Sequence, residues 1–412
     1  MIHGIPWIGG AAVDLLSVKI LVANLGSTSL KWRLFAFTSE EVALLHRGGL
    51  ERVKDYPSAI QECLEQLKEA GAIEEESELS AIGFKTVLAQ SVTGCVALSE
   101  EVLKDMEAGN QIAPAHNPPY LTGIRLFAER MPHTPLVGLF ETAFYQWMPE
   151  TSKRYGVPQS WFEAGVRRWG FHGASHKFIA ERSSELLGRE DVAERARQLY
   201  VNQGQSLVKG PSLRVVSAHL GGSSSVTGIR DGVAIGNSMG LSPQSGLPHN
   251  NRVGDLDAMA IPYMIQKQGW TMEQVLHDLC SSGGLSGLSG GFNDLRDVQS
   301  RAEEGHADAQ LALDFLVAEV RRWMGAYYLE LGGLDALVFT AGIGENRPQL
   351  RKAICRGLEP LGIRLDESLN EGCLGHEGFI SDANSPVKVL VIPTNEELVV
   401  AREVKRFLEN KS

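Results

Sequence analysis

Three glycine-containing turns, two of them also rich in hydroxyl side chains, could bind phosphate, because each follows an apolar run. They are residues 24–29, residues 219–223 (His219, Leu220, Gly221, Gly222, Ser223) and residues 342–346 (Gly342, Ile343, Gly344, Glu345, Asn346). Glycine lets backbone N–H groups approach phosphate oxygens. One such turn is usually structural, but three after buried strands favour a nucleotide polyphosphate site. The chain has no GxGxxG dinucleotide motif and no GxxxxGK[ST] P-loop.

Basic side chains and a histidine near the predicted turns could contact a transferring phosphoryl group. Lys31 lies seven residues after Asn24, on the expected return strand, and could act as a point charge. His172 stands between Phe171 and Gly173, at a turn before an expected helix, and could donate to the phosphoryl group. An exposed strand lysine is the alternative for Lys31. The i, i+4 spacing of His172 and His176 occurs in metal sites, but no nearby carboxylate completes such a site here.

Arginine residues in two further loops suit phosphate or carboxylate recognition. Arg252 lies three residues before the start of an expected helix, and Asp294, Leu295 and Arg296 follow a glycine- and serine-rich loop. A surface ion pair is the commoner role of such arginines, and both interpretations remain open on these residues alone.

The elements that must position these residues alternate between strands and helices, which indicates an α/β fold. We predict strands at 18–23, 31–37, 82–88, 135–140, 214–218, 226–230, 336–340 and 387–392. Helical patterns cover 56–70, 100–107, 121–130, 175–187, 255–268, 309–331 and 396–410. Three prolines in residues 113–120 predict a loop there.

Two short segments resemble each other, which raises the possibility of two similar halves. Residues 22–29 read VANLGSTS and residues 217–224 read SAHLGGSS, and each lies between an expected strand and its hairpin return. The motifs are nearly half the chain apart. Duplication and chance explain such a short match about equally well.

The composition is that of a globular protein. The chain has 412 residues, 43% hydrophobic and 22% charged, which fits two or three domains. Its net charge of −11 argues against nucleic-acid and anionic-membrane partners. The five cysteines form no CxxC pair, and no long uncharged apolar span or signal peptide is evident, so we expect a cytoplasmic protein. Residues 1–17 are expected to be an irregular extension.

Nine strings in fixed order resemble the acetate kinase family of the actin-like ATPase superfamily. They are NLGSTSLKW at 24, APAHNP at 113, RRWGFHGASH at 167, AHLGGSSS at 218, SMGLSP at 238, NRVGDLD at 251, NDLRD at 293, FTAGIGENR at 339 and IPTNEEL at 392. The resemblance implies two actin-like (ribonuclease H-like) α/β domains with a cleft between them. The first would comprise residues 1–147 and 394–412, the second residues 148–393. It also implies a homodimer that transfers the γ-phosphate of ATP to a short-chain carboxylate, first of all acetate, with Mg²⁺ or alternatively Mn²⁺.

The resemblance also implies roles for single residues. Asn24 and Glu396 would bind the metal, and Glu141, His172 and Arg252 would be catalytic. Lys85, Val87, Phe171 and Pro243 would bind the carboxylate substrate. ATP would contact Lys31, His219, Leu220, Gly221, Gly222, Ser223, Asp294, Leu295, Arg296, Gly342, Ile343, Gly344, Glu345 and Asn346.

The chain departs from the family pattern mainly at the carboxylate end. Lys85 stands where arginine is usual, which loses the bidentate fork, and Glu141 stands where aspartate is usual. Gly222 and Ser223 replace the usual Asn-Gly of the phosphate loop. Two interpretations follow: a kinase with an altered rate or carboxylate preference, such as propionate, or a nucleotide-binding homologue with an impaired acyl site. A sugar kinase and a pyrophosphate-dependent enzyme fit the motifs less well.

Overall fold

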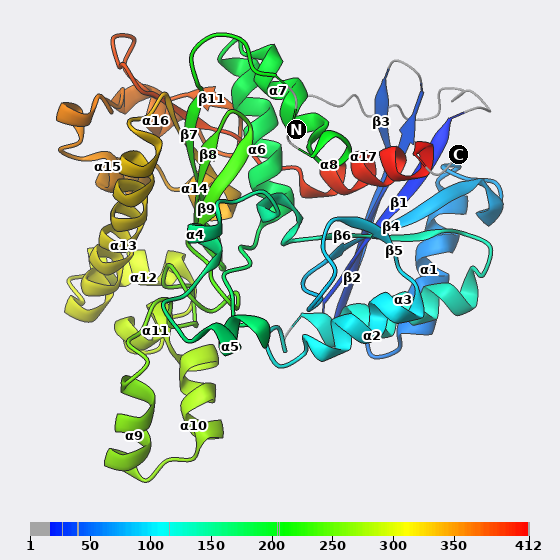
Figure 1. Ribbon diagram of the computed structural model, residues 1–412, viewed down its shortest axis with the longest axis horizontal. Coiled ribbons are helices and arrows are strands. Elements are labelled where there is room, and N and C mark those ends of the chain that lie inside the picture. The colour runs from blue at the N-terminus through cyan, green and yellow to red at the C-terminus, as the bar shows by residue number, and fades with distance from the viewer. Residues whose placement is uncertain are drawn as a thin grey trace.

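The computed structural model describes residues 17–26, 28–38, 41–114, 116–203, 205 and 207–410, so the expected extension lies almost wholly outside it. Two sheets, each flanked by helices, form two lobes (Figure 1). Within the described ranges, no helix has the length and apolarity needed to cross a membrane.

The first lobe is built on a six-stranded sheet in the order β3-β2-β1-β4-β6-β5. Its strands are β1 (Val18–Leu25), β2 (Ser29–Phe37), β3 (Val42–Glu51), β4 (Leu79–Thr86), β5 (Cys95–Ala97) and β6 (Leu136–Phe140). β1, β2 and β3 are antiparallel, β1 pairs with β4 and β4 with β6 in parallel, and β5 closes the edge antiparallel to β6.

The second lobe repeats this topology strand for strand. Its order is β9-β8-β7-β10-β12-β11 from the hairpin edge, with the same sequence of parallel and antiparallel pairs. The strands are β7 (Arg214–His219), β8 (Ser225–Arg230), β9 (Val233–Asn237), β10 (Ala336–Thr340), β11 (Gly378–Phe379) and β12 (Lys388–Val391). The shared topology, with Asn24 near the end of β1 and His219 ending β7, favours duplication over chance.

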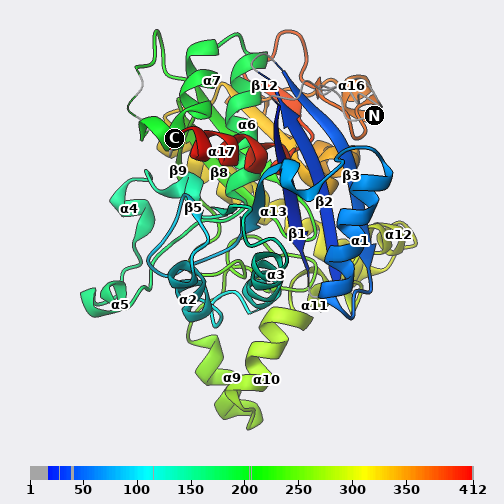
Figure 2. The same cartoon turned by 90° about the vertical axis from the view of Figure 1, so that its right-hand side faces the viewer.

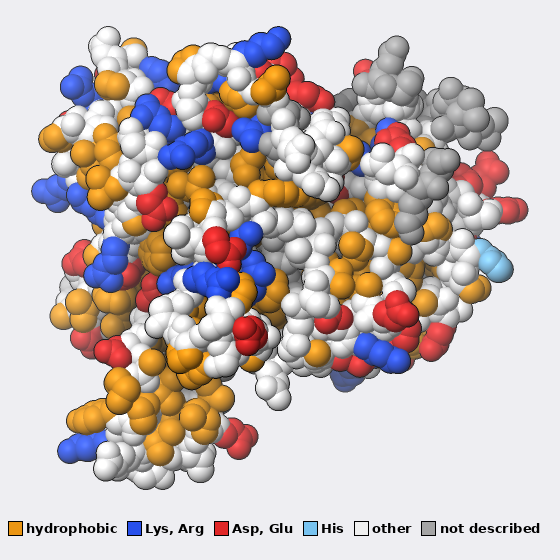
Figure 3. All heavy atoms as spheres, viewed as in Figure 1, with side chains coloured by type: hydrophobic (Ala, Val, Ile, Leu, Met, Phe, Trp, Pro, Cys, Tyr) orange, Lys and Arg blue, Asp and Glu red, His pale blue; other side chains and the backbone are white. Residues whose placement is uncertain are grey.

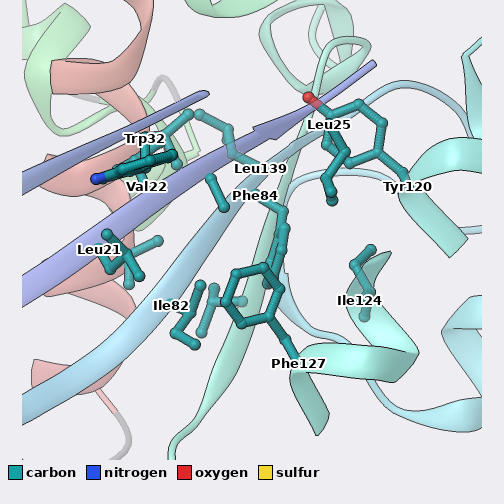
Figure 4. Packing of buried hydrophobic residues seen from close by; sticks show 14 of the residues in the cluster. Leu21, Val22, Leu25, Trp32, Ile82, Phe84, Tyr120, Ile124, Phe127 and Leu139 are labelled. Carbon is teal, nitrogen blue, oxygen red and sulfur yellow. The ribbon is translucent and has the colours of Figure 1, made fainter. Parts of the chain in front are cut away.

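Helices cover both faces of the first sheet. A Cβ on Gly83 of β4 would meet Val400 and Val404 of α17 (Glu396–Glu409). The next residue, Phe84, packs edge-on against Phe127 of α3 (Asn117–Arg130), with ring centroids 5.6 Å apart (Figure 4). Successive strand residues point to opposite faces, so α17 and α3 lie on opposite sides. α1 (Tyr56–Glu69) and α2 (Glu100–Ala108) complete the lobe.

The second sheet is covered in the same way. One apolar cluster joins Val215 and Val338 to Ile179 of α6 (Gly173–Leu186) and to α7 (Glu190–Arg197). Another joins the alternate strand residues to α13 (Ala307–Leu331). α6 also packs against α17, which places helices of the two lobes side by side (Figure 2).

Shorter helices make up the rest of the described chain. They are α4 (Glu150–Lys153), α5 (Gln159–Glu163), α8 (Leu199–Asn202), α9 (Ala260–Gln268), α10 (Met272–His277), α11 (Gly284–Ser289), α12 (Leu295–Glu303), α14 (Ala341–Asn346), α15 (Pro348–Cys355), α16 (Glu367–Gly372), a π-helical turn at Asp278–Ser282, and 3₁₀ turns at Glu76–Glu78, Ala143–Tyr145 and Glu359–Leu361.

Three sequence-based boundaries were wrong. The loop predicted for residues 113–120 contains the start of α3, because Pro118 and Pro119 occupy its first turn, where no N–H is needed. The helix predicted from residue 255 begins at Ala260. The strand predicted for 82–88 is β4, which begins and ends earlier.

Candidate active site

Lys85 lies between two carboxylates that come from different elements. It is the penultimate residue of β4, Glu141 directly follows β6, and Glu396 is the first residue of α17. The Lys85 Nζ is 3.1 Å from Glu141 Oε1 and also forms a short ion pair with Glu396. β4 and β6 are parallel neighbours, so their carboxyl ends meet at one edge of the sheet.

Burial and charge act in opposite directions on these three groups. Burial raises the pKa of Glu141, which is only 5% exposed and whose Oε2 has no hydrogen-bond partner among the described residues. Burial also acts to raise the pKa of Glu396, but the Lys85 ammonium holds it below its usual value. Burial opposes the charge of Lys85, yet Glu396 and Glu141 keep its pKa well above the usual value. Lys85 therefore carries its positive charge at neutral pH.

Asn24 lies beside this carboxylate cluster. Its Nδ2 donates to Glu397 Oε1 at 3.0 Å, and its Oδ1 accepts a weak hydrogen bond from the Tyr120 hydroxyl at 3.4 Å. Glu397 also pairs with Arg33 at 3.3 Å. α17 can begin here because the Asn395 side chain caps it by accepting from the Leu398 N–H.

Three histidines from α6 and β7 form a buried hydrogen-bonded cluster. His172 Nδ1 and His176 Nε2 both bond the Ser225 Oγ at 2.8 Å, and His176 Nδ1 bonds Ser217 Oγ at 2.8 Å. The His172 ring stacks on His219, with centroids 4.0 Å apart. His219 Nδ1 in turn bonds Ser175 Oγ. The i, i+4 pair His172 and His176 thus belongs to a hydrogen-bond network with Ser217 and Ser225.

The imidazoles of this cluster are neutral at neutral pH. Burial, reinforced by the neighbouring rings, lowers the pKa of His172 and His176 well below the usual value, and burial lowers that of His219 to about 4. His172 has a left-handed backbone (φ 59°) at the corner where α6 begins. Strain of this kind in a residue other than glycine is typical of functional sites.

The second and third glycine turns meet in space. The Leu220 carbonyl accepts from the N–H groups of Ile343 (2.8 Å) and Gly344 (3.0 Å), so the loop after β7 packs on α14. Glu345 Oε1 accepts from the Thr394 N–H, which links α14 to the segment before α17. Gly222 and Gly342 are exposed, so their backbones are accessible to a ligand.

Arg252 comes from a loop of the second lobe and is held by Pro243. Its Nη1 donates to the Pro243 carbonyl at 2.9 Å. Burial and the positive charges of Arg252 and Lys85 together lower the pKa of His116 to about 4, so both cations act on this imidazole. His116 therefore lies in the field of both Arg252 and Lys85.

Other predicted site residues lie in less distinctive surroundings. Lys31 forms an exposed ion pair with Glu51 at 2.8 Å. Asp294 caps α12 and pairs with Arg296 at 2.6 Å, also near the surface, while Leu295 is buried. Val87 and Phe171 belong to the apolar core of the first lobe, so they could line a site only with an edge of their side chains.

The structure adds residues that sequence reasoning missed. Ser225, Tyr120, His116 and Glu397 contact or lie near the predicted residues. Ser225 closes the AHLGGSSS string, His116 lies in APAHNP and Glu397 follows Glu396, so the motifs contained a signal for these three. Tyr120 follows a proline pair that we predicted to be a loop, and nothing in the pattern indicated it.

The donor set fits a magnesium ion. An amide oxygen (Asn24) and carboxylates (Glu396, Glu397, and the unpartnered Oε2 of Glu141) are the hard oxygen ligands that Mg²⁺ prefers. Among the described residues there is no cluster of three His, Cys, Asp or Glu side chains arranged for a metal. A Mg²⁺ site does not need such a cluster, since the ion keeps water and phosphate oxygens as ligands and usually takes only one or two ligands from the protein.

Comparison with known proteins shows the family of this chain. The Acetokinase family matches residues 46–402. Acetate kinases of Bacillus cytotoxicus and Bacillus subtilis are each 38% identical to this chain. The matches cover 94% of this chain and 98% and 99% of those two proteins, respectively. The crystal structure of Porphyromonas gingivalis acetate kinase superposes with a TM-score of 0.82 at 31% identity, covering 95% of this chain and all of that one. The crystal structure of a propionate kinase from Francisella tularensis superposes with a TM-score of 0.79 at 31% identity, covering 94% of this chain and 98% of that one.

Proposed function

Because the chain belongs to the acetokinase family, we propose that it transfers the γ-phosphoryl group of ATP to a short-chain carboxylate. A carboxylate oxygen forms a bond to Pγ, the bond from Pγ to the β,γ-bridging oxygen breaks, and acyl phosphate and ADP leave. Acetate is the first candidate and propionate the second. The observation that carries the proposal is that the group of Lys85, Glu141 and Glu396 lies close to the stacked His172 and His219. The Gly173 N–H next to His172 donates to the Glu141 carbonyl, and the charges of Lys85 and Glu396 act on the pKa of His219.

Asn24 and Glu396 would hold Mg²⁺, which when bound supplies charge neutralisation for the phosphates. Mn²⁺ is an alternative with the same oxygen ligands. On the protein side, the exposed backbone of residues 219–223 and the start of α14 would contact the nucleotide phosphates, with Asp294 and Arg296 toward the nucleoside. Lys31 would reach ATP only after leaving Glu51, which an exposed ion pair permits at little cost.

The histidine cluster can present a proton donor to the phosphoryl group. One consistent hydrogen-bond direction has Ser217 donating to His176 Nδ1, His176 Nε2–H donating to Ser225, and the Ser225 hydroxyl donating to His172 Nδ1. The proton of neutral His172 then lies on Nε2, available to a phosphoryl oxygen. Arg252 would add a second positive charge to the site.

Lys85 would bind the carboxylate of the substrate. We expect Lys85→Ala to raise the KM for the carboxylate about 10- to 100-fold, the worth of a charge-assisted hydrogen bond. The KM for ATP should change little. Steady-state kinetics with each substrate varied in turn measures both constants, and equal small changes in the two would remove Lys85 from this role.

A coupled ADP-release assay with Mg-ATP tests the activity itself. Formate, acetate, propionate and butyrate are compared, with hydroxylamine present to trap acyl phosphate as hydroxamate. We expect carboxylate-dependent ADP and hydroxamate in equal amounts. Mg-ATP binding without turnover on any carboxylate would support the impaired homologue, and the first cause to examine would be the commitment of Lys85 to two carboxylates.

Assembly, location and domain limits complete the proposal. We propose a cytoplasmic homodimer with domains at 1–147 plus 394–412 and 148–393; the packing of α17 on the first sheet supports this division. Support for the dimer is an apolar surface on the projecting α9–α10 unit (Figure 3), formed by Leu256, Met259, Tyr263, Met272 and Leu276. Sedimentation should find a dimer that Met259→Lys and Tyr263→Asp together dissociate.

A further inference from the structure

A group of charged side chains, three of them buried and two partly exposed, joins α6 to α17 behind the candidate site. The Lys177 side chain is fully buried, and its Nζ is 2.9 Å from Glu403 Oε1 and forms a short ion pair with Glu181. Arg402 Nη1 lies 3.2 Å from Glu181 Oε2, and Arg406 Nη1 lies 2.5 Å from Glu403 Oε1. We call Lys177, Glu181, Arg402, Glu403 and Arg406 the α6–α17 ion cluster.

Stability alone is a poor reason for such a cluster. Removing charges from water is costly, and well-packed apolar side chains in their place are often as stable or more so. Charged pairs differ from apolar contacts because they are satisfied only in a narrow range of positions. The Lys177 ammonium is confined further by the Tyr200 ring, whose centroid is 5.4 Å away.

The position of the cluster connects it to both halves of the site. α6 begins directly after His172, and α17 begins with Glu396. Lys177 is five residues along α6 from His172, and Glu403 is seven residues along α17 from Glu396. At 1.5 Å per residue, the cluster lies about 8 to 10 Å behind both helix ends. A shift between the two helices at this point would move His172 relative to Glu396.

We propose that the α6–α17 ion cluster is a positioning device for phosphoryl transfer. Its charged pairs hold His172, at the start of one helix, at a fixed spacing from Glu396, at the start of the other. This inference rests on the proposed kinase function for its kinetic consequences. The physical claim, that the cluster fixes the two helix ends, stands apart from that activity.

Two variants and one control test the kinetic consequence. Glu403→Gln keeps the shape but removes a charge, and the double variant Lys177→Met with Glu403→Leu replaces the central pair by apolar groups. We expect kcat to fall about 10- to 100-fold in both, because displacement of reacting groups by about 1 Å has effects of this size. The KM values for ATP and acetate should change less than about threefold. Lys405→Met, which breaks the more exposed pair with Glu409 on the same helix, should keep the wild-type kcat.

Hydrogen exchange gives a readout that does not need activity. Amides of residues 171–176 and 394–399 should exchange faster in the double variant than in the wild type, while the central strands stay protected. Wild-type exchange at both helix ends, in a folded variant, would overturn the proposal. If the double variant does not fold, Glu403→Gln carries the same comparison. An inactive wild type would overturn the proposed function, and exchange alone would then decide the positioning role.

Discussion

Lys85 and Glu141, which differ separately from the usual family residues, are in contact in the structure. Lysine is shorter than arginine and glutamate is longer than aspartate, and the two charged ends meet at 3.1 Å. The two changes therefore compensate in length. The pair is the feature that a rebuilt acyl site and an impaired one would share, so the kinetic behaviour of the pair has to distinguish them.

The compensation predicts strong coupling between the two positions. Glu141→Asp alone should lower kcat about 10- to 100-fold, because the shortened carboxylate loses Lys85 and leaves a buried acid displaced by about one methylene. Adding Lys85→Arg, which restores the usual family pair, should recover at least half of the lost free energy of activation. A double-mutant cycle on kcat measures the coupling. Additive effects would mean that the two residues act independently.

The motifs contain most of the residues that we predicted for the site, but they do not indicate the contacts that those residues make. The nine ordered strings contained His172, Arg252 and Glu396, and the apolar runs before the glycine turns indicated where those turns lie. Ser225, which bonds two histidines, and Tyr120, which bonds Asn24, depend on elements far apart in the chain. Such contacts follow from the packing of the elements and leave no local signal.

Among the elements, buried strands and the glycine turns after them were predicted well, since apolar runs and turn residues are local signals. The start of α3 was missed because proline marks both loops and first helical turns. The short edge strand β5 was not predicted, since its partner β6 lies far along the chain. The strand β9 and the helix α10 were also not predicted, although each has a local signal: the Asp231-Gly232 turn after β8, and the capping box of Thr271 and Gln274.

The corner between β6 and α6 depends on a close approach of two backbones. The Gly173 N–H donates to the Glu141 carbonyl at 3.0 Å, and a Cβ on Gly173 would lie only 2.2 Å from that oxygen. Gly173→Ala should therefore push α6 away from Glu141 and lower kcat about 100-fold or more. Assays below the unfolding temperature separate this effect from instability.

Gly325→Ala is the matched control for this substitution. Gly325 lies within α13, and a Cβ there would meet no atom within 4 Å. Activity should be unchanged, and stability should rise by about 0.5–1 kcal/mol, since alanine is the better helix former. Wild-type kcat in Gly173→Ala would show that the corner is not tight.

The histidine cluster makes stability depend on pH. The pKa of His219 is about 4 in the folded chain, against about 6.5 when unfolded. Between these values the unfolded state binds the extra proton, so the contribution is complete above pH 6.5 and is lost as pH falls toward 4. The loss is about 1.4 kcal/mol per pH unit for each such group. The negative charge of Glu396 raises the pKa of His219, and the positive charge of Lys85 lowers it.

Urea unfolding at pH 7.5, 6 and 5 measures this dependence. Other buried groups titrate in the same range, so the informative quantity is the difference between the wild type and His219→Asn. The variant should have a smaller slope of unfolding free energy against pH. Equal slopes would mean that His219 is protonated in the folded chain at pH 5.

At the scale of the whole molecule, the residues of the candidate site come from both lobes. Asn24, Lys85, Glu141 and Glu396 belong to the elements around the first sheet, whereas residues 219–223, Arg252 and α14 belong to the second lobe. A duplicated fold with its glycine turns at corresponding strand ends produces this arrangement, since each copy offers a turn for phosphate. Sequence similarity between the turns indicated the duplication, but only the repeated strand order distinguishes it from chance.

This division predicts that ligands draw the lobes together. A phosphoryl group that contacts His172 and Mg²⁺ at once joins both lobes, and the gain in charge-assisted contacts favours a closed state. Small-angle scattering should give a smaller radius of gyration with Mg-ATP plus acetate than without ligand. Glu396→Gln, which weakens the metal site on the first lobe, should reduce the change at the same ligand concentrations. An unchanged scattering curve at saturating ligand would mean that the two lobes are already at their working distance, held there in part by the packing of α6 against α17.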